Sequence, residues 1–172
     1  HLILERELIS CERYHEPLSL VFIDIDNFKQ INDQHGHLVG SELLTEVGEF
    51  FRTSIRKSDV PIRYGGDEFV LVFPRTLKID ALQSIHRLMT RIRNHEFLSS
   101  KNLNIKITAS FGLASFPEDG QNKDGLIFAA DKAMYVVKKS TKNSVYVFNA
   151  PVTHDFIRTD HPRLPFHPKK LN

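Results

Sequence analysis

The sequence is poor in cysteine and tryptophan and contains no long apolar run. Its 172 residues include one cysteine, Cys11, and no tryptophan. A single cysteine cannot form a disulfide within the chain, which suits a reducing compartment such as the cytoplasm. No apolar segment approaches the roughly 20 residues that a helix needs to span a bilayer. We therefore expect a cytoplasmic domain. Because the sequence begins at His1 rather than at methionine, we expect it to be a piece of a longer protein that membrane segments elsewhere could tether.

An excess of charge of one sign is also lacking. The 23 Lys and Arg residues nearly balance the 21 Asp and Glu residues, for a formal net charge of +2. A protein that wraps duplex nucleic acid normally has a strong basic excess, so no nucleic-acid partner is expected. The 41% hydrophobic and 26% charged residues are typical of an ordinary globular protein, and the length suits one domain.

The apolar pattern predicts alternating helices and strands. Helical spacing of apolar residues favours helices over 2–14, 38–56, 79–94 and 126–139, with a short helical turn over 27–33. Runs of strand-forming residues favour strands over 18–23, 60–64, 69–73, 105–115 and 145–148. Because hairpins alternate with helix crossovers, we predict an α+β fold whose central, mainly antiparallel sheet is covered by helices.

Two acidic residues occupy places where a site is easily built. Asp24 follows a buried strand, and Asp67 lies at the tip of a predicted hairpin after Gly65 and Gly66. Adjacent strands lie about 4.8 Å apart, so these acids could share a divalent cation if their strands are neighbours. Mg²⁺ prefers one or two carboxylates plus phosphate oxygens. The alternative is an ordinary hairpin turn beside an unrelated acid at the end of a strand.

A family resemblance favours the first alternative. Residues 63–69, Arg-Tyr-Gly-Gly-Asp-Glu-Phe, resemble the signature of the GGDEF family of diguanylate cyclases. Further segments that resemble the family, in the family's order, are 22–33, 36–37, 110–112, 116–120 and 130–135. The resemblance covers roughly residues 2–149, and it implies a fold similar to polymerase palms and nucleotidyl cyclases. It also implies an enzyme that condenses two nucleoside triphosphates into a cyclic dinucleotide and releases pyrophosphate.

The resemblance implies a magnesium site. Asp24 and Asp67 would hold two Mg²⁺ ions per active site, with help from the Ile25 carbonyl, and Mn²⁺ is a possible substitute. Asp67 would also accept the proton of the attacking 3′-hydroxyl. Glu68 would support the geometry of metal and substrate.

The resemblance also implies phosphate contacts. Backbone amides at Asn27, Phe28 and Lys29 would hold the terminal phosphates at a helix N-terminus. Lys138 and Lys142 would reach the triphosphate from the last helix. Family members usually carry arginine at position 142, and lysine lacks the bidentate fork of arginine. Without the resemblance, both lysines would be interpreted as a solvated helix end.

One departure from the family bears on the choice of base. The guanine-reading asparagine is present as Asn32, and His37 is interpreted as a loop residue beside the nucleotide pocket. The usual aspartate is replaced by Ser41, whose hydroxyl can donate or accept, whereas a carboxylate only accepts. This replacement resembles the hybrid promiscuous subgroup, which uses GTP and ATP and makes cyclic GMP-AMP alongside cyclic di-GMP. The alternative is a strict GTP-only diguanylate cyclase in which Asn32 alone fixes guanine.

Regulation and assembly are also implied by the resemblance. Arg56 and Asp59 match a product-inhibition site, to which Arg91 would contribute from a second molecule. The plainer interpretation is a helix-end arginine followed by a capping aspartate. Each domain would present one triphosphate, so the active species is predicted to be a homodimer. An upstream sensor or receiver domain is also expected.

Two functions of other classes compete with catalysis. A catalytically inactive domain could bind nucleotide or cyclic dinucleotide as a receptor, and a protein-interaction module could use the fold only for dimerisation. Retention of the acids Asp24, Asp67 and Glu68 favours the enzyme.

The composition changes near the C-terminus. Four of the eight prolines lie there, at Pro151, Pro162, Pro165 and Pro168. We predict a catalytic domain over 1–149 and an extended, poorly ordered tail over 150–172. The tail contains three histidines, but their spacing matches no zinc pattern, so no histidine metal site is expected.

Overall fold

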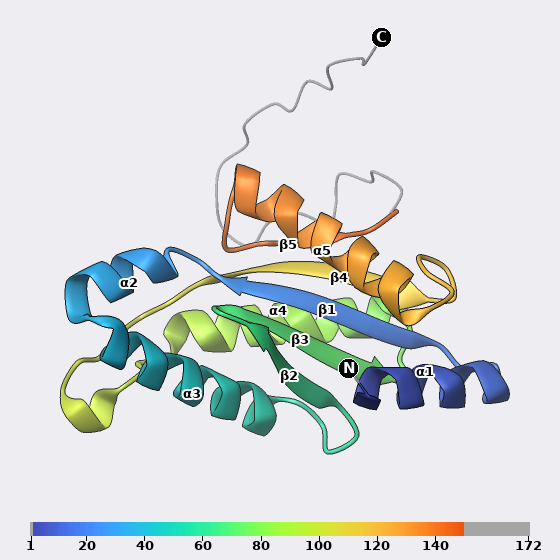
Figure 1. Ribbon diagram of the computed structural model, residues 1–172, viewed down its shortest axis with the longest axis horizontal. Coiled ribbons are helices and arrows are strands. Elements are labelled where there is room, and N and C mark those ends of the chain that lie inside the picture. Colours follow the sequence, from blue (N-terminus) through green and yellow to red (C-terminus); the bar gives the residue numbers. More distant parts are fainter. Residues whose placement is uncertain (1, 150–172) are drawn as a thin grey trace, which may run out of the picture.

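The computed structural model describes residues 2–149, so the predicted tail lies outside the described residues. A five-stranded sheet is covered by helices (Figure 1). The helices are α1 (Leu2–Tyr14), α2 (Phe28–His35), α3 (His37–Ser54), α4 (Lys78–Asn94) and α5 (Lys123–Ser140), with a short 3₁₀ turn, η1 (Ser99–Lys101). The strands are β1 (Leu18–Ile25), β2 (Val60–Gly65), β3 (Glu68–Pro74), β4 (Ala109–Phe116) and β5 (Val145–Val147). The predicted α+β class is confirmed.

The sheet is mainly antiparallel, as predicted. Its strand order is β2-β3-β1-β4-β5, and β4 with β5 is the parallel pair. β1 lies at the centre and pairs antiparallel with β3 and β4. This register places Asp24 opposite Glu68 on one side and opposite Ser110 on the other. The end of the central strand therefore brings together residues that are far apart in the sequence.

Side-chain alternation along β1 divides the core between the two faces of the sheet. Val21, Ile23 and Ile25 belong to a cluster formed with α3 and α4, whereas Leu20 and Phe22 belong to a cluster formed with α1 and α5. All eight β1 residues are buried. Each large apolar side chain buried in this way contributes about 1.5–3 kcal/mol. Helices on both faces explain why residues 18–23 form an apolar run, interrupted only by the buried Ser19, instead of an alternating pattern.

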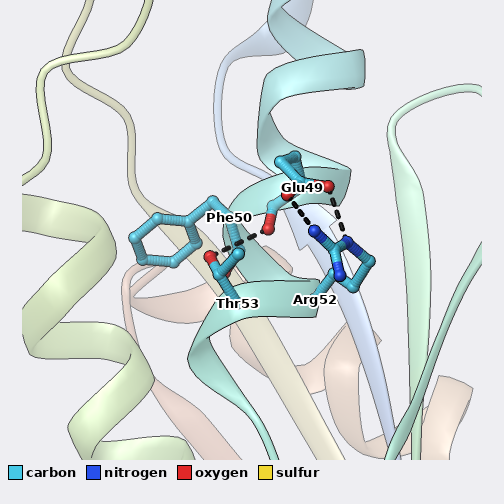
Figure 2. A network of polar contacts seen from close by, with 4 residues as sticks. All are labelled: Glu49, Phe50, Arg52 and Thr53. Atoms are coloured by element: carbon cyan, nitrogen blue, oxygen red, sulfur yellow. Dashed lines mark hydrogen bonds and ion pairs between the residues drawn. The ribbon is translucent and has the colours of Figure 1, made fainter.

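The outer side of α3 is polar, which completes its amphipathic pattern. In Figure 2, Arg52 pairs with the carboxylate of Glu49, and its Nε donates to Glu49 Oε2 at 2.7 Å. Thr53 Oγ1 donates to the carbonyls of Glu49 and Phe50 at 3.0 and 3.1 Å. Phe50 itself is buried, with an exposed fraction of 7%. The predicted helical stripe therefore faces the core, and its charged positions face solvent.

The predicted strand over 105–115 is shifted in the structure. Alternating burial does continue back to Ile105 and Ile107, which are 8% and 4% exposed. However, the ladder with β1 begins only where Ala109 pairs with Ile25, the last residue of β1. Ile105 instead forms an isolated bridge to Phe97, with N–O distances of 2.9 Å in both directions. The alternation correctly predicted burial. However, after Asp26, whose N–H donates to the Thr108 carbonyl at 2.9 Å, the chain turns into α2 and offers no strand with which Ile105 and Ile107 could pair.

The helices of residues 2–149 are all too short or too polar to cross a membrane.

Candidate active site at the end of the central strand

Three carboxylates converge where β1 ends beside the β2–β3 hairpin. Asp24 alternates onto the same face as Leu20 and Phe22, and the register places Glu68 directly opposite it. Asp67 precedes Glu68 in the hairpin turn, and its carbonyl accepts a hydrogen bond from Ile25 N at 3.3 Å. The condition set by the sequence argument, that the two acid-bearing strands are neighbours, is therefore met. Figure 1 shows this hairpin tip lying beside the end of β1 from which α2 continues.

The hairpin turn that carries Asp67 is held in a defined shape. Gly66 has a φ of +49°, in the left-handed region where glycine is favoured. The Arg63 guanidinium donates to the Gly66 carbonyl through Nε at 3.1 Å and Nη2 at 2.9 Å. The pairing register shifts between Arg63 and Gly65, as in a β-bulge. The bulge and the hydrogen bonds from Arg63 together fix the position of Asp67 in the hairpin turn.

The electrostatics of this cluster are dominated by negative charge. Burial, reinforced by the neighbouring Asp67 carboxylate, raises the pKa of Asp24, which is only 2% exposed. Burial and the charges of Asp24 and Asp67 likewise raise the pKa of Glu68. Lys138 of α5 pairs with Asp24 Oδ2. Burial alone would lower the pKa of Lys138, but Asp24, Asp67 and Glu68 together raise it. One lysine therefore only partly offsets three carboxylates.

The acids suit a divalent cation. Asp24 Oδ1 is buried and has no hydrogen-bond partner among the described residues. An unpaired buried carboxylate oxygen is costly, and a cation would supply the missing partner. Within residues 2–149, no three His, Cys, Asp or Glu side chains are grouped as a metal cage. Mg²⁺ usually takes one or two carboxylates together with substrate phosphates. The unpaired Asp24 Oδ1 beside the Asp67 carboxylate therefore fits the predicted ion, and the part of the Ile25 carbonyl stays a prediction.

Asp26 is a buried acid at the site to which the sequence argument gave no role. It is 4% exposed, and its carboxylate accepts from Thr108 Oγ1 at 2.7 Å, Ser110 Oγ at 2.7 Å and Asn143 N at 2.9 Å. These bonds tie the end of β1 to the start of β4 and to the loop after α5. Both oxygens of Asp26 therefore have hydrogen-bond partners, unlike Asp24 Oδ1, and this fits a structural role at the site. Only the register with β4 reveals its partners, so the local sequence carries no signal for this role.

The predicted phosphate-binding residues lie together around the start of α2. Asn27 adopts a left-handed conformation with φ 58°, and α2 begins at the next residue, Phe28. Lys142 Nζ donates to Asn27 Oδ1 at 2.7 Å, so the segment after α5 reaches the α2 N-terminus. Lys29 is exposed in the first turn of α2. Lys138 of α5 donates a hydrogen bond to the carboxylate of Asp24. The structure thus joins Lys142 to Asn27 and places Lys138 on Asp24, three residues before Asn27. Phosphate binding by these five residues stays a prediction.

The predicted base-reading residues lie where α2 meets α3. Asn32 is on α2, and its Oδ1 is buried without a hydrogen-bond partner among residues 2–149. Ser41 is exposed in the N-terminal part of α3. The prediction that His37 is a loop residue is wrong, because α3 begins directly after Gly36 and His37 is its first residue. Gly40, the neighbour of Ser41, lies against the Asn32 side chain. Asn32 and Ser41 therefore meet at one junction, with His37 at its edge.

Two of the predicted product-inhibition residues follow α3, which ends at Ser54 and not at Arg56 as predicted, and the third lies on α4. Arg56 N donates to Asp59 Oδ2 at 3.0 Å, so the plainer capping interpretation describes Asp59 in this structure. Arg56 is exposed and Asp59 is partly buried, and both lie in the segment between the end of α3 and β2. The Arg91 guanidinium of α4 lies 5.5 Å from the centre of the Phe50 ring on α3. The inhibitory role of these three residues stays a prediction.

Comparison with known proteins shows the family of the chain. Residues 1–144 match the family model described as "Diguanylate cyclase, GGDEF domain". The chain belongs to the GGDEF domain family. It is 34% identical over 148 residues to diguanylate cyclase DosC of Escherichia coli, an alignment that covers 86% of this chain and 32% of DosC. The chain thus spans about a third of the length of that curated relative.

Solved structures show the same fold. The GGDEF domain of YfiN, also called TpbB, from Pseudomonas aeruginosa superposes with a TM-score of 0.80 at 31% identity. That match covers 86% of this chain and 92% of the other. The GGDEF domain of DgcB from Caulobacter crescentus, determined in complex with c-di-GMP, gives a TM-score of 0.74 at 26% identity. It covers 84% of this chain and 85% of the other.

Proposed function

We propose that this chain is the catalytic domain of a cyclic dinucleotide synthase that joins two nucleoside triphosphates and releases pyrophosphate. The observation that carries this proposal is the convergence of Asp24, Asp67 and Glu68 from two adjacent strands, with Asp24 Oδ1 buried and unpaired. The name of DosC and the c-di-GMP bound to DgcB support the same product class. Inactive receptor domains that have lost one of the acids are poorly matched by this site.

Each half-reaction makes and breaks one bond to phosphorus. The 3′-hydroxyl oxygen of one nucleotide bonds to the α-phosphorus of the other, the bond from that phosphorus to the bridging oxygen of the β-phosphate breaks, and pyrophosphate leaves. Asp67 is the proposed acceptor of the hydroxyl proton. Two divalent ions, Mg²⁺ or in its place Mn²⁺, would stabilise the charge developing on the attacking and leaving oxygens. Asp24, Asp67 and the Ile25 carbonyl would hold them, and Glu68 would support that geometry.

The remaining residues would orient the triphosphate. Amides at Asn27, Phe28 and Lys29 are proposed to bind its terminal phosphates at the start of α2. Lys142, whose Nζ donates to Asn27 Oδ1, would contact the same phosphates from this position. The Lys138 side chain is 40% exposed, so it can turn from Asp24 to a phosphate when a cation takes its place.

Both GTP and ATP are proposed as substrates, with cyclic di-GMP and 3′,3′-cyclic GMP-AMP as products. Asn32 would read guanine, while Ser41 would tolerate either base because its hydroxyl donates or accepts. A strict GTP-only enzyme is the competing outcome. The exposure of Ser41 beside the Asn32 contact supports its proposed place next to the base.

Catalysis would require a homodimer, because each domain offers one triphosphate and both phosphodiester bonds must form between two of them. The cyclic product would bind back at Arg56 and Asp59, with Arg91 supplied by a second molecule. An upstream sensor or receiver domain is proposed to control the pairing. We propose a cytoplasmic site of action.

A product assay tests the proposed function. Purified protein with Mg²⁺ is given GTP, ATP or both, and products are resolved by mass spectrometry. We expect cyclic di-GMP from GTP alone and additional cyclic GMP-AMP from the mixture. Asp67→Asn should reduce product formation at least a thousandfold, since it removes a metal ligand and proton acceptor. Asp124→Asn, at an acid 90% exposed at the start of α5, is the matched control. No product at concentrations that force dimers would favour the receptor function.

Base choice is tested separately by Ser41→Asp. A fixed acceptor should favour the guanine N1–H and N2 donors and repel the adenine N1 acceptor. We expect the fraction of cyclic GMP-AMP in the mixed assay to fall about tenfold, the scale of one base-reading contact. An unchanged product ratio would refute the role of Ser41 while leaving the cyclase assignment intact.

A further inference from the structure

The junction of α2 and α3 contains an unusually close contact between a glycine and a functional side chain. Gly36 links the two helices: its N–H donates to the Asn32 carbonyl at 2.8 Å, and its carbonyl accepts from Gly40 N at 3.1 Å. Gly40 is buried on α3 and faces α2. A Cβ added at Gly40 would lie 1.8 Å from Asn32 Oδ1, 3.0 Å from Asn32 Cγ and 3.1 Å from Cζ of Phe28.

No ordinary side chain fits at this position while Asn32 keeps its place. A separation of 1.8 Å is far inside the contact distance of two heavy atoms, whichever way the Asn32 amide is flipped. The amide would have to swing away, or α2 would have to move off α3. Asn32 Oδ1 is buried against Gly40 and has no hydrogen-bond partner among residues 2–149.

Backbone conformation gives no reason for glycine at position 40. Its φ is not in the left-handed region, and glycine is one of the poorest helix formers. Gly48, in the same helix, provides the contrast: a Cβ there would meet only the Phe69 ring, at an ordinary 3.7 Å. Glycine is therefore required at position 40 because of the contact with Asn32, and no such contact requires it at position 48.

We propose that Gly40 is a positioning residue that holds the Asn32 amide in its base-reading orientation by leaving room for it against α3. This inference rests on the proposed function, in which Asn32 reads guanine. Gly40 and Ser41 then divide the work at the α2–α3 junction. Gly40 faces inward and sets where Asn32 lies, and Ser41 faces outward toward the nucleotide.

The test compares Gly40→Ala, Gly48→Ala, Asn32→Ala and the double variant Gly40→Ala/Asn32→Ala. The first readout is the side-chain NH₂ resonance of Asn32 in the protein without nucleotide. The second is the affinity for guanosine 5′-[α,β-methylene]triphosphate with Mg²⁺, an analogue whose α–β linkage cannot break. Thermal unfolding monitors the fold. Because alanine is the better helix former, weaker binding by Gly40→Ala cannot be attributed to a weakened helix.

We expect Gly40→Ala to shift the Asn32 resonance and to weaken analogue binding about five- to tenfold, the loss of one hydrogen-bonded pair. Asn32→Ala should weaken binding equally, and the double variant should be no weaker than either single variant because the clashing amide is gone. Gly48→Ala should change neither readout.

Two results would overturn the inference: an Asn32 resonance that stays in place in Gly40→Ala, or losses of affinity that multiply in the double variant. Failure of the proposed function would look different. The wild-type chain would not bind the analogue at all, although the Asn32 resonance would still move in Gly40→Ala, and the base-reading role of Gly40 would fall with it.

Discussion

The two faces of the sheet are built for different purposes. On the face covered by α3 and α4, side chains remain apolar to the end of β1, through Val21, Ile23 and Ile25. On the face covered by α1 and α5, the same strand is apolar at Leu20 and Phe22 and then presents Asp24. We call these the closed face and the open face. The closed face buries apolar side chains along its whole length, whereas the open face has charged side chains at one end.

The open face is costly, as the raised pKa values of Asp24 and Glu68 indicate. Burial is the first cause of both shifts, and repulsion from Asp67 adds to each. Charges held close together in a partly buried place destabilise a fold until a ligand offsets them. The closed face has no such group near the site, because α3 and α4 meet the sheet through aromatic and aliphatic side chains. The residues that stabilise the fold and the proposed catalytic residues thus lie on opposite faces of one sheet.

The largest expected effect comes from opening the closed face. Phe69 is 1% exposed and packs edge-on against Phe51 at 5.3 Å between ring centres. Phe69→Ala should lower the free energy of unfolding by about 4 kcal/mol, through lost burial and the cavity left behind. Urea denaturation measures it, with Phe128→Ala, at a phenylalanine 59% exposed on α5, as the matched control. A loss below about 1 kcal/mol would contradict the role given to the closed face.

A smaller effect is expected from Asp26, which shares the open end with Asp24 but is satisfied by three donors. Asp26→Asn should lower the free energy of unfolding by about 2 kcal/mol, because the Asn143 N–H or a hydroxyl loses its charged acceptor. Asp24→Asn should change stability less and activity far more. Denaturation and the product assay on both variants check the contrast. Equal stability losses would mean that the two aspartates are not divided between structure and chemistry.

The smallest expected effect is a gain. Glu68→Gln removes a charge that Asp24 and Asp67 disfavour, so without divalent ions it should raise the free energy of unfolding by about 1 kcal/mol while product formation falls. Thermal unfolding in the presence of a chelator measures the gain. Glu12→Gln, the same change at an exposed acid of α1, should leave stability unchanged. A destabilised Glu68→Gln protein would show that this carboxylate is structural.

Much of the fold could be predicted because it depends on local patterns. Helices and strands follow apolar spacing, and the glycines before Asp67 predict a hairpin turn. The beginning of β4 could not be predicted, because the alternation at Ile105 and Ile107 reflects burial, whereas strand pairing depends on where β1 ends. Apolar periodicity predicts which side of a segment is buried, but it does not predict which strand the segment pairs with.

The site divides in the same way. The sequence by itself determined which residues are candidates for chemistry, since a carboxylate, a lysine or an asparagine has its character wherever it lies. It also determined that Asp24 lies near the end of a buried strand. Only the tertiary structure decided that Glu68 faces Asp24, that Lys138 reaches it from 114 residues away, and that Asn32 needs the bare backbone of Gly40. These contacts join residues that are far apart in the sequence. Their distances depend on how whole helices and strands pack, and no local sequence pattern encodes that packing.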